Sequence, residues 1–464
     1  MYIKRVFSLI ILAVSGVFPL FGLDLPTAQI ADDSLLRNRL KDSWLIESPG
    51  RVVTRRAVLQ TLASGERVEV RAEEGRNEFM VIFARELMAG RVAAGDQPAV
   101  PRSGTGQYPG WAQGSWMLIR RKDSGQAVLI RVFLRSDQYT YVQFRPLSAD
   151  KCQMDVVLYG GYVVNSLPLP IPFERLYTIP VSDVLKLAED KFPRKYFDPD
   201  PKDYDSQRKF IAQIRQRLPD LRFVDDGAID ENGDYVFIET QERQSQDQSS
   251  GGLNCSGFAK WLIDGILRPV TGGRLAVPPL KAPFGDRGSS FTDMWEERRD
   301  PFFGLDWIRN LASEAGAVLR SPAYRVLEEI EVRHDKFPLV MVPANRNFVT
   351  NSYPGFLENA GYGIEGLHPM LYTLAIDEPG RFYLAAVNTE TGPAATRENP
   401  RGAPRLRQYF HIAALIPYFD ELGEFRIVVF ESAAETSFNS FKNRYPIGYN
   451  VNLVRIPVKT AFDP

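Results

Sequence analysis

The first part of the chain alternates short apolar runs with turn-forming residues. Residues 115–147 hold three such runs, separated by Asp-Ser-Gly and by Ser-Asp-Gln, and residues 154–164 ("MDVVLYGGYVV") continue the pattern. Short apolar runs between turn residues predict consecutive strands. Helical spacing appears only in residues 79–89 ("FMVIFARELMA"), which we expect to form a helix. We therefore predict a β-rich N-terminal domain over residues 23–180.

The pattern changes after a segment rich in proline. Residues 166–180 contain four prolines and are predicted to be a linker or an irregular edge. Residues 181–192 and 204–218 then place apolar side chains three and four positions apart behind a Ser or Asp, which predicts two helices. Residues 234–241 ("DYVFIETQ") predict a strand, and residues 242–252 predict a polar loop.

The clearest helix follows this loop. In "CSGFAKWLIDGIL" (255–267) apolar residues recur at helical spacing, so we expect one buried face and a helix that ends at Pro269. Asn254 can cap this helix by accepting a hydrogen bond from a backbone N–H of the first turn. Gly257 would let another segment pack closely against that turn. The pattern therefore places Cys255 at the start of a helix.

The rest of the chain is predicted to add an insertion and two hairpins. Residues 270–345 are rich in Pro, Gly, Arg and aromatic side chains, with one predicted helix at 305–316, and we expect them to form an insertion over the domain. Residues 368–388 and 411–431 each predict a hairpin, and residues 448–458 predict a last strand. The two turns are expected at residues 377–380 and 420–423.

Composition and charge are typical of a globular protein. The 464 residues suggest two or three domains, and 44% hydrophobic with 24% charged residues are typical globular values. A net charge of −1 without a long basic block gives no support for nucleic-acid binding.

Lys4 and Arg5 precede an apolar stretch that is typical of a signal peptide over residues 1–22 and is too short to span a membrane. We expect export to the periplasm or cell envelope, with secretion as an alternative, and no integral membrane segment after signal removal.

Only two cysteines are present, Cys152 and Cys255. An oxidising compartment could join them in a disulfide, and an inert buried thiol is the other alternative for Cys255. A helix start favours a reactive thiolate, because unpaired N–H groups and the helix dipole stabilise negative charge. The N–H groups of Cys255 and Ser256 could also hold the oxyanion that forms when a carbonyl is attacked. Gly251 and Gly252 would then expose the thiol to a substrate.

The sequence "NCSGFAKWL" around Cys255 resembles the nucleophile motif of the NlpC-type papain-like cysteine peptidases, in which Asp-Cys-Ser-Gly opens an apolar helix. "YFHIAALIPYFDELGEFRIVVFES" is similar to the second motif of that family, a strand that opens with histidine, then a turn and a strand that ends in a polar orienting residue. "GRFYLAAVN" resembles the strand that precedes it. The chain departs from the family in having Asn254 in place of Asp, in lacking the upstream tyrosine and Trp-Gly-Gly, and in the long stretch from cysteine to histidine.

The resemblance implies a papain-like α+β domain over residues 181–464, with an antiparallel sheet packed on the cysteine helix. It also implies a cysteine peptidase or amidase that hydrolyses amide bonds in cell-wall (peptidoglycan) peptides, commonly next to D-glutamate, through an acyl-enzyme and without a metal. An inactive binding or structural protein of the envelope and an acyltransferase that uses the same Cys-His pair are the alternatives. We expect a peptide or peptidoglycan partner and no cofactor, since the sequence lacks metal-ligand spacings such as C-x-x-C. The β-rich domain would position the protein on the wall or on a partner.

Three histidines are the candidates for a catalytic base, and the alternative for each is a core or surface histidine without a catalytic role. His334 lies in a charged stretch and is predicted to be solvated. His368 and His411 each lie twenty residues before a polar residue, which could face its histidine across two antiparallel strands and fix the imidazole. We favour His411 because it lies inside a continuous strand-like run and fits the family pattern, whereas His368 precedes a proline. The expected catalytic residues are Cys255, His411 and Glu431, with His368 and Asn388 as the alternative base and orienting residue.

Overall fold

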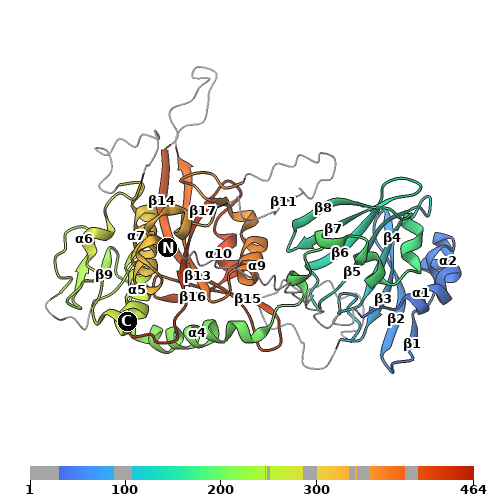
Figure 1. Ribbon diagram of the computed structural model, residues 1–464, viewed down its shortest axis with the longest axis horizontal. Coiled ribbons are helices and arrows are strands. Elements are labelled where there is room, and N and C mark those ends of the chain that lie inside the picture. Colours follow the sequence, from blue (N-terminus) through green and yellow to red (C-terminus); the bar gives the residue numbers. More distant parts are fainter. Residues whose placement is uncertain are drawn as a thin grey trace, which may run out of the picture.

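The structure, a computed structural model, consists of two lobes (Figure 1). Both lobes are built on large antiparallel sheets with accompanying helices, so the fold class is α+β, as predicted. The predicted signal peptide and His334 lie outside the described residues. The residues that the structure describes are 31–87, 107–245, 247, 251–285, 300–333, 340–341, 355–391 and 406–464.

The first lobe is a sheet in which each strand pairs with the next along the chain. Within the described residues it has nine strands in the order β1 to β8, with β11 from the second half of the chain at the far edge. The strands expected between residues 115 and 164 are confirmed. The bounds are β1 Val58–Thr61, β2 Arg67–Glu74, β3 Glu78–Arg85, β4 Trp116–Arg121, β5 Ala127–Val132, β6 Thr140–Pro146, β7 Cys152–Leu158, β8 Gly161–Leu169 and β11 Val340–Met341.

The helix expected at residues 79–89 is wrong, because residues 78–85 form strand β3. Nearly every side chain of β3 after Glu78 is buried, so the strand lacks the polar–apolar alternation of a half-exposed strand. A short run that is apolar on both faces cannot be told from a helix by its spacing.

Helices at the start of the lobe are α1 Ser34–Leu40, the π-helical turn Lys41–Leu45 and α2 Pro49–Val53.

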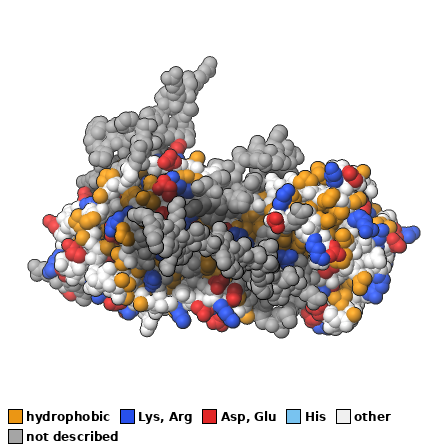
Figure 2. Space-filling model, viewed as in Figure 1, with side chains coloured by type: hydrophobic (Ala, Val, Ile, Leu, Met, Phe, Trp, Pro, Cys, Tyr) orange, Lys and Arg blue, Asp and Glu red, His pale blue; other side chains and the backbone are white. Residues whose placement is uncertain are grey.

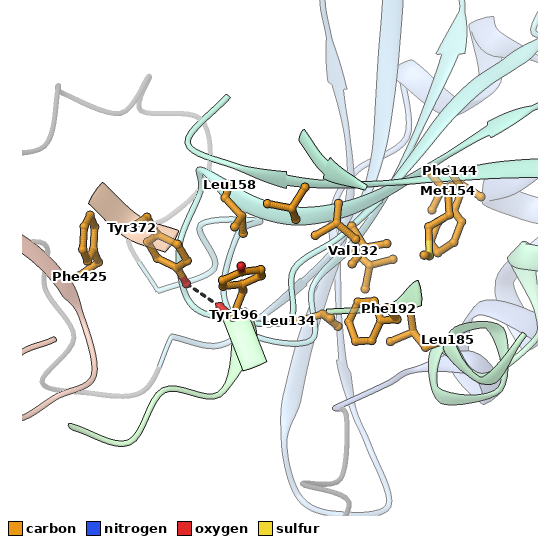
Figure 3. Close-up of a cluster of buried hydrophobic side chains, with 14 of the residues drawn as sticks. Val132, Leu134, Phe144, Met154, Leu158, Leu185, Phe192, Tyr196, Tyr372 and Phe425 are labelled. Carbon is orange, nitrogen blue, oxygen red and sulfur yellow. Dashed lines mark hydrogen bonds between the residues drawn. The ribbon is translucent and has the colours of Figure 1, made fainter. Parts of the chain in front are cut away.

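Residues 166–197 belong to the first lobe and do not form a free linker. Strand β8 runs through Pro168, and a 3₁₀ helix at Phe173–Tyr177 and helix α3 (Val181–Lys186) follow it. Leu185 and Phe192 pack in one hydrophobic cluster with side chains of the first sheet (Figure 3). The helix expected at residues 181–192 is thus confirmed in its first part, and its packing extends the lobe past the predicted boundary at residue 180.

In the part of the chain that the structure describes, the second lobe is a six-stranded antiparallel sheet between two layers of helices. Alternate side chains of its central strand β13 point to opposite faces: Leu384 packs with helices α4, α5 and α7, and Ala385 with α9 and α10. The strand order is β12-β17-β13-β14-β15-β16. The sheet strands are β12 Tyr362–Gly363, β13 Arg381–Thr391, β14 Leu406–Phe419, β15 Phe425–Glu431, β16 Ala434–Ser437 and β17 Asn450–Pro457, and β9 Gly227–Ile229 pairs with β10 Tyr235–Phe237. The helices are α4 Asp205–Arg217, α5 Cys255–Thr271, α6 Val277–Leu280, α7 Phe303–Leu319, α8 Leu327–Ile330, α9 Leu367–Asp377 and α10 Phe438–Asn443.

Helix α5 begins at Cys255 as predicted, but it passes Pro269 and ends at Thr271. A proline inside a helix leaves the carbonyl four residues earlier without its usual N–H donor. Here that carbonyl, of Gly265, accepts a 2.7 Å hydrogen bond from the N–H of Asp463. The end of the chain therefore supplies the missing donor, and Gly272 closes the helix with φ +76°.

The hairpin expected at residues 368–388 is wrong, because its first half is helix α9. This helix is buried on nearly all sides, so its sequence shows no helical period. The helix expected at 204–218 is confirmed as α4, the one expected at 305–316 as α7, and the last strand as β17. Helix α7 packs on α5 and β17, so it is part of the core and not a peripheral insertion.

The hairpin at residues 411–431 is confirmed, with its turn where it was expected. Strands β14 and β15 pair from Phe419↔Phe425 onward, and the N–H of Asp420 donates to the carbonyl of Glu424 across the turn. Among the described residues, no helix has the length and apolar character that a membrane span requires. On the face shown in Figure 2, positive and negative side chains are interspersed over both lobes.

Candidate active site

The thiol of Cys255 lies at the N-terminal end of α5, where the local sequence fixes the helix start. The side chain of Asn254 accepts a 2.8 Å hydrogen bond from the N–H of Gly257, as expected for an N-cap residue. A Cβ at position 257 would lie 2.0 Å from the carbonyl oxygen of Gly227 in β9, so only glycine permits this contact. The first turn of α5 is therefore held both by its cap and by close packing on β9.

The glycines before the cysteine have another role than the one expected. A Cβ at Gly251 would lie 2.2 Å from the ring of Tyr235, and one at Gly252 would lie 2.6 Å from the carbonyl oxygen of Arg222. Both glycines are buried. They let the preceding loop pack tightly against the lobe, so the expectation that they expose the thiol to a substrate is wrong.

Three side chains predicted from the sequence meet at this helix start. His411 on β14 hydrogen-bonds to Cys255, and its Nε2 lies 2.7 Å from Oε2 of Glu431 on β15. Because Nε2 is engaged by the carboxylate, Nδ1 is the ring nitrogen left for the thiol. At this end of the hairpin, the β14–β15 pairing reaches Ala414↔Phe430. Glu431 therefore reaches His411 diagonally, whereas the sequence predicted that the two residues would lie directly opposite each other.

These contacts favour a charged pair. Burial raises the pKa of the Cys255 thiol, but the hydrogen bond and charge of His411 and the N–H of Ile412 outweigh it and leave the pKa below its ordinary value. Burial lowers the pKa of His411, but Cys255 and Glu431 raise it to about 9. Both shifts favour a thiolate–imidazolium pair over the neutral thiol and imidazole.

A pocket of about 480 Å³ opens above the thiol. It is lined by both motif residues Cys255 and Ser256, by His411, and by aromatic side chains at its rim. Phe223 and Phe410 are 61% and 47% exposed there, which is unusual for such large apolar side chains. The first N–H groups of α5 have no helical partner, so those of Cys255 and Ser256 are available to a carbonyl oxygen bound in this pocket.

The alternative base and orienting residue lie elsewhere. His368 is on α9, stacked 4.0 Å from the ring centre of Tyr159, and burial with the charge of Lys442 lowers its pKa to about 3. Asn388 is buried, donates to the carbonyl of Ala360 and accepts from Arg407. Neither residue lines the pocket of Cys255. Since His368 is helical, the expected cross-strand pairing of His368 with Asn388 is wrong.

The disulfide considered for the two cysteines is also wrong, because both thiols are free. Cys152 begins β7, is fully buried in the core of the first lobe, and has its pKa raised to about 11 by burial. Cys255, the first residue of α5, packs at the edge of a second hydrophobic cluster, which includes residues of α5 and α7. Within the described part of the chain, no group of three His, Cys, Asp or Glu side chains could hold a metal ion.

Sequence reasoning missed two polar contacts of the site. Arg444, just after α10, forms an ion pair with Oε1 of Glu431. The indole N–H of Trp307 on α7 donates a 2.9 Å hydrogen bond to the carbonyl of Ser256, which ties the helix start to the neighbouring helix. Neither residue lies in a recognisable motif, and only the folded structure shows that both reach the site.

Comparisons with known proteins bear on the first lobe. Residues 26–196 match the family model described as "Domain of unknown function (DUF8515)". No curated protein and no solved structure matches the chain. The matched region ends at Tyr196, close to where the packing of the first lobe ends, and does not include Cys255, His411 or Glu431.

Proposed function

We propose that the protein is a cysteine hydrolase that cleaves amide bonds through a thioester on Cys255. The observation that carries the proposal is the continuous chain Cys255–His411–Glu431 at a helix start beneath an open pocket. A nucleophile, a base and a group that orients the base are the parts that covalent catalysis of acyl transfer requires. The arrangement supports a papain-like organisation of the second lobe, in which the antiparallel sheet packs on the cysteine helix.

The reaction follows from the charges of these groups. The thiolate of Cys255 attacks the carbonyl carbon, and the negative charge that moves to the oxygen is held by the first N–H groups of α5. The imidazolium of His411 gives its proton to the leaving nitrogen as the C–N bond breaks, which leaves a thioester. His411 then takes a proton from water as the water oxygen attacks the thioester carbon; the C–S bond breaks, the acid product leaves, and the thiolate and imidazolium are restored.

We propose peptides of the cell wall as the substrate class and the cell envelope as the location. The resemblance of "NCSGFAKWL" and of the histidine hairpin to the NlpC-type peptidases supports the substrate class, and the signal-like residues 1–22 support export. Asn254 departs from the usual Asp of that family, yet its amide oxygen caps the helix as a carboxylate would. This departure therefore leaves the nucleophile in place.

The rate at which iodoacetamide alkylates Cys255, measured against pH, tests the proposal. The protein would begin at Leu23 and carry Cys152→Ala, so that a single thiol remains. We expect rapid labelling well below pH 8, because the thiolate persists there, and a large loss of that labelling in His411→Ala. The matched variant His368→Ala should keep the profile. A thiol that reacts no faster than a cysteine of the unfolded chain would contradict the proposal and favour an inactive binding protein.

Product analysis separates hydrolysis from acyl transfer. The thioester can pass its acyl group to water or to an amine, and the chemistry up to that point is the same. Cell-wall peptides incubated with the protein and an added amine should yield the free carboxylic acid if hydrolysis dominates. An amide of the added amine as the main product would identify an acyltransferase.

A further inference from the structure

The carboxylate of Glu431 is held by more than the histidine. It is buried, with 5% of the residue exposed, and each oxygen has a charged partner: Oε2 faces His411 and Oε1 pairs with Arg444. The side chain of Thr436 on β16 adds a further hydrogen bond. A buried carboxylate whose two oxygens both have partners is restricted in orientation, and this orientation aims Oε2 at the imidazole.

The chain returns to Glu431 by a short route. Ser432 and Ala433 both adopt positive φ, 47° and 64°, and form the tight turn that pairs Glu431 with Ala434. Strand β16 leads directly into α10, and Arg444 is the residue that ends this helix. Its guanidinium lies over the ring of Tyr445 at 5.6 Å from the ring centre, which fixes its direction.

We propose that Arg444 is a positioning residue of the Cys255 centre, which holds the carboxylate of Glu431 ionised and directed at His411. This inference rests on the proposed function. The charges then alternate along the site, from thiolate to imidazolium to carboxylate to guanidinium. The groups that face Glu431 are His411 from β14, Thr436 from β16, and Arg444 with Tyr445 from the segment after α10.

Removal of Arg444 is expected to change the acid side of the pH profile of Cys255 alkylation. Burial raises the pKa of Glu431, and His411, Thr436 and Arg444 together bring it below the ordinary value. Without the guanidinium, Glu431 takes up a proton at a higher pH and no longer stabilises the imidazolium. The site also loses one positive charge that favours the thiolate. Both effects move the onset of thiolate reactivity to higher pH.

The test compares Arg444→Gln and Arg444→Lys with Arg215→Gln in the single-cysteine protein. Arg215 is a matched control, because it also pairs with a glutamate, Glu435 on β16, and its side chain is 49% exposed against 46% for Arg444. We expect Arg444→Gln to move the acid limb of the iodoacetamide profile up by about one pH unit, Arg444→Lys to recover at least half of that shift, and Arg215→Gln to leave the limb unchanged. Urea unfolding of each variant shows whether it is folded.

Two results would overturn the inference. One is an acid limb of Arg444→Gln that superimposes on that of the parent protein, and the other is an equal shift in Arg215→Gln. If Arg444→Gln does not fold, the folded Arg444→Lys carries the test, because loss of the planar guanidinium still shifts the limb partway. A parent protein without any reactive thiolate at low pH removes the proposed function itself, and this outcome is distinct from an unshifted variant.

Discussion

His411 lies between the thiol group of Cys255 and the carboxylate of Glu431. Burial alone would favour the neutral imidazole, so the charge on the ring depends on these two partners. His368 shows the opposite case, since it packs among aromatic rings, and burial with the charge of Lys442 lowers its pKa to about 3 and keeps it neutral. The environment, and not the residue type, decides which histidine can act as a base.

The isosteric change Glu431→Gln tests this dependence. The amide can still hydrogen-bond to Nε2 but carries no charge, so the imidazolium loses one of its two stabilising partners. We expect the pKa of His411 to fall from about 9 by at least about one unit, and thus toward or below the ordinary value of about 6.5. Titration of the ring by NMR measures it, and the His411→Ala spectrum assigns the signal. A pKa that stays near 9 would show that the carboxylate does not hold the proton on the ring.

Helix α5 positions Cys255, the proposed nucleophile, because both of its ends are fixed by particular contacts. At the start, Gly257 packs on Gly227, and near the end Asp463 pairs with the carbonyl that Pro269 leaves free. Gly265 packs against the ring of Phe462, and a Cβ at position 265 would lie 2.2 Å from a ring carbon. The terminal segment of the chain therefore locks the helix whose other end carries Cys255.

Two glycine substitutions on α5 should differ in cost. In Gly257→Ala the new Cβ meets a backbone oxygen, so we expect a loss of about 3 kcal/mol in the free energy of unfolding, together with slower alkylation of Cys255. Gly272→Ala puts its Cβ into open space and costs only the strain of positive φ, about 1 kcal/mol. Urea unfolding followed by circular dichroism gives both values. Equal losses would mean that the contact with β9 does not constrain the helix start.

The two lobes share one continuous hydrophobic core. A single hydrophobic cluster extends from the first sheet to α9 and to the face of the second sheet that α9 covers. The hydroxyl of Tyr372 on α9 donates a 2.6 Å hydrogen bond to the carbonyl of Tyr196 (Figure 3). Tyr159, at the β7–β8 turn of the first lobe, stacks on His368 of the second. The second half also adds strand β11 to the first sheet. We therefore expect the lobes to unfold together.

A reporter in one lobe and a mutation in the other test this coupling. In a Cys255→Ala protein, Cys152 is buried in the first lobe and reacts with a thiol reagent only after unfolding. Tyr372→Ala in the second lobe should lower the urea midpoint for labelling of Cys152, because it removes about 3 kcal/mol of packing from the shared core. Phe223→Ala, at an exposed position, should leave the midpoint nearly unchanged. An unaltered midpoint in Tyr372→Ala would show that the lobes unfold independently.

The sequence determined the elements whose signals are local. The cap and apolar face of α5, the alternating strands of the first lobe and the hairpin that carries His411 and Glu431 were all predictable, because each depends on residues a few positions apart. Segments buried on all sides were not, and β3 and α9 were each assigned the wrong type. A fully apolar run has no exposed face, so it carries no period that distinguishes a strand from a helix.

Only the tertiary structure decided which groups meet. The thiol, the imidazole and the carboxylate come from α5, β14 and β15. The sequence already favoured His411, but only the positions of the two rings show that His368 lies away from Cys255. Arg444 reaches Glu431, and Asp463 reaches Gly265, through contacts between segments that no local pattern links. The sequence names the chemically able residues, but their distances and charges depend on packing between distant parts of the chain, which residue spacing does not encode.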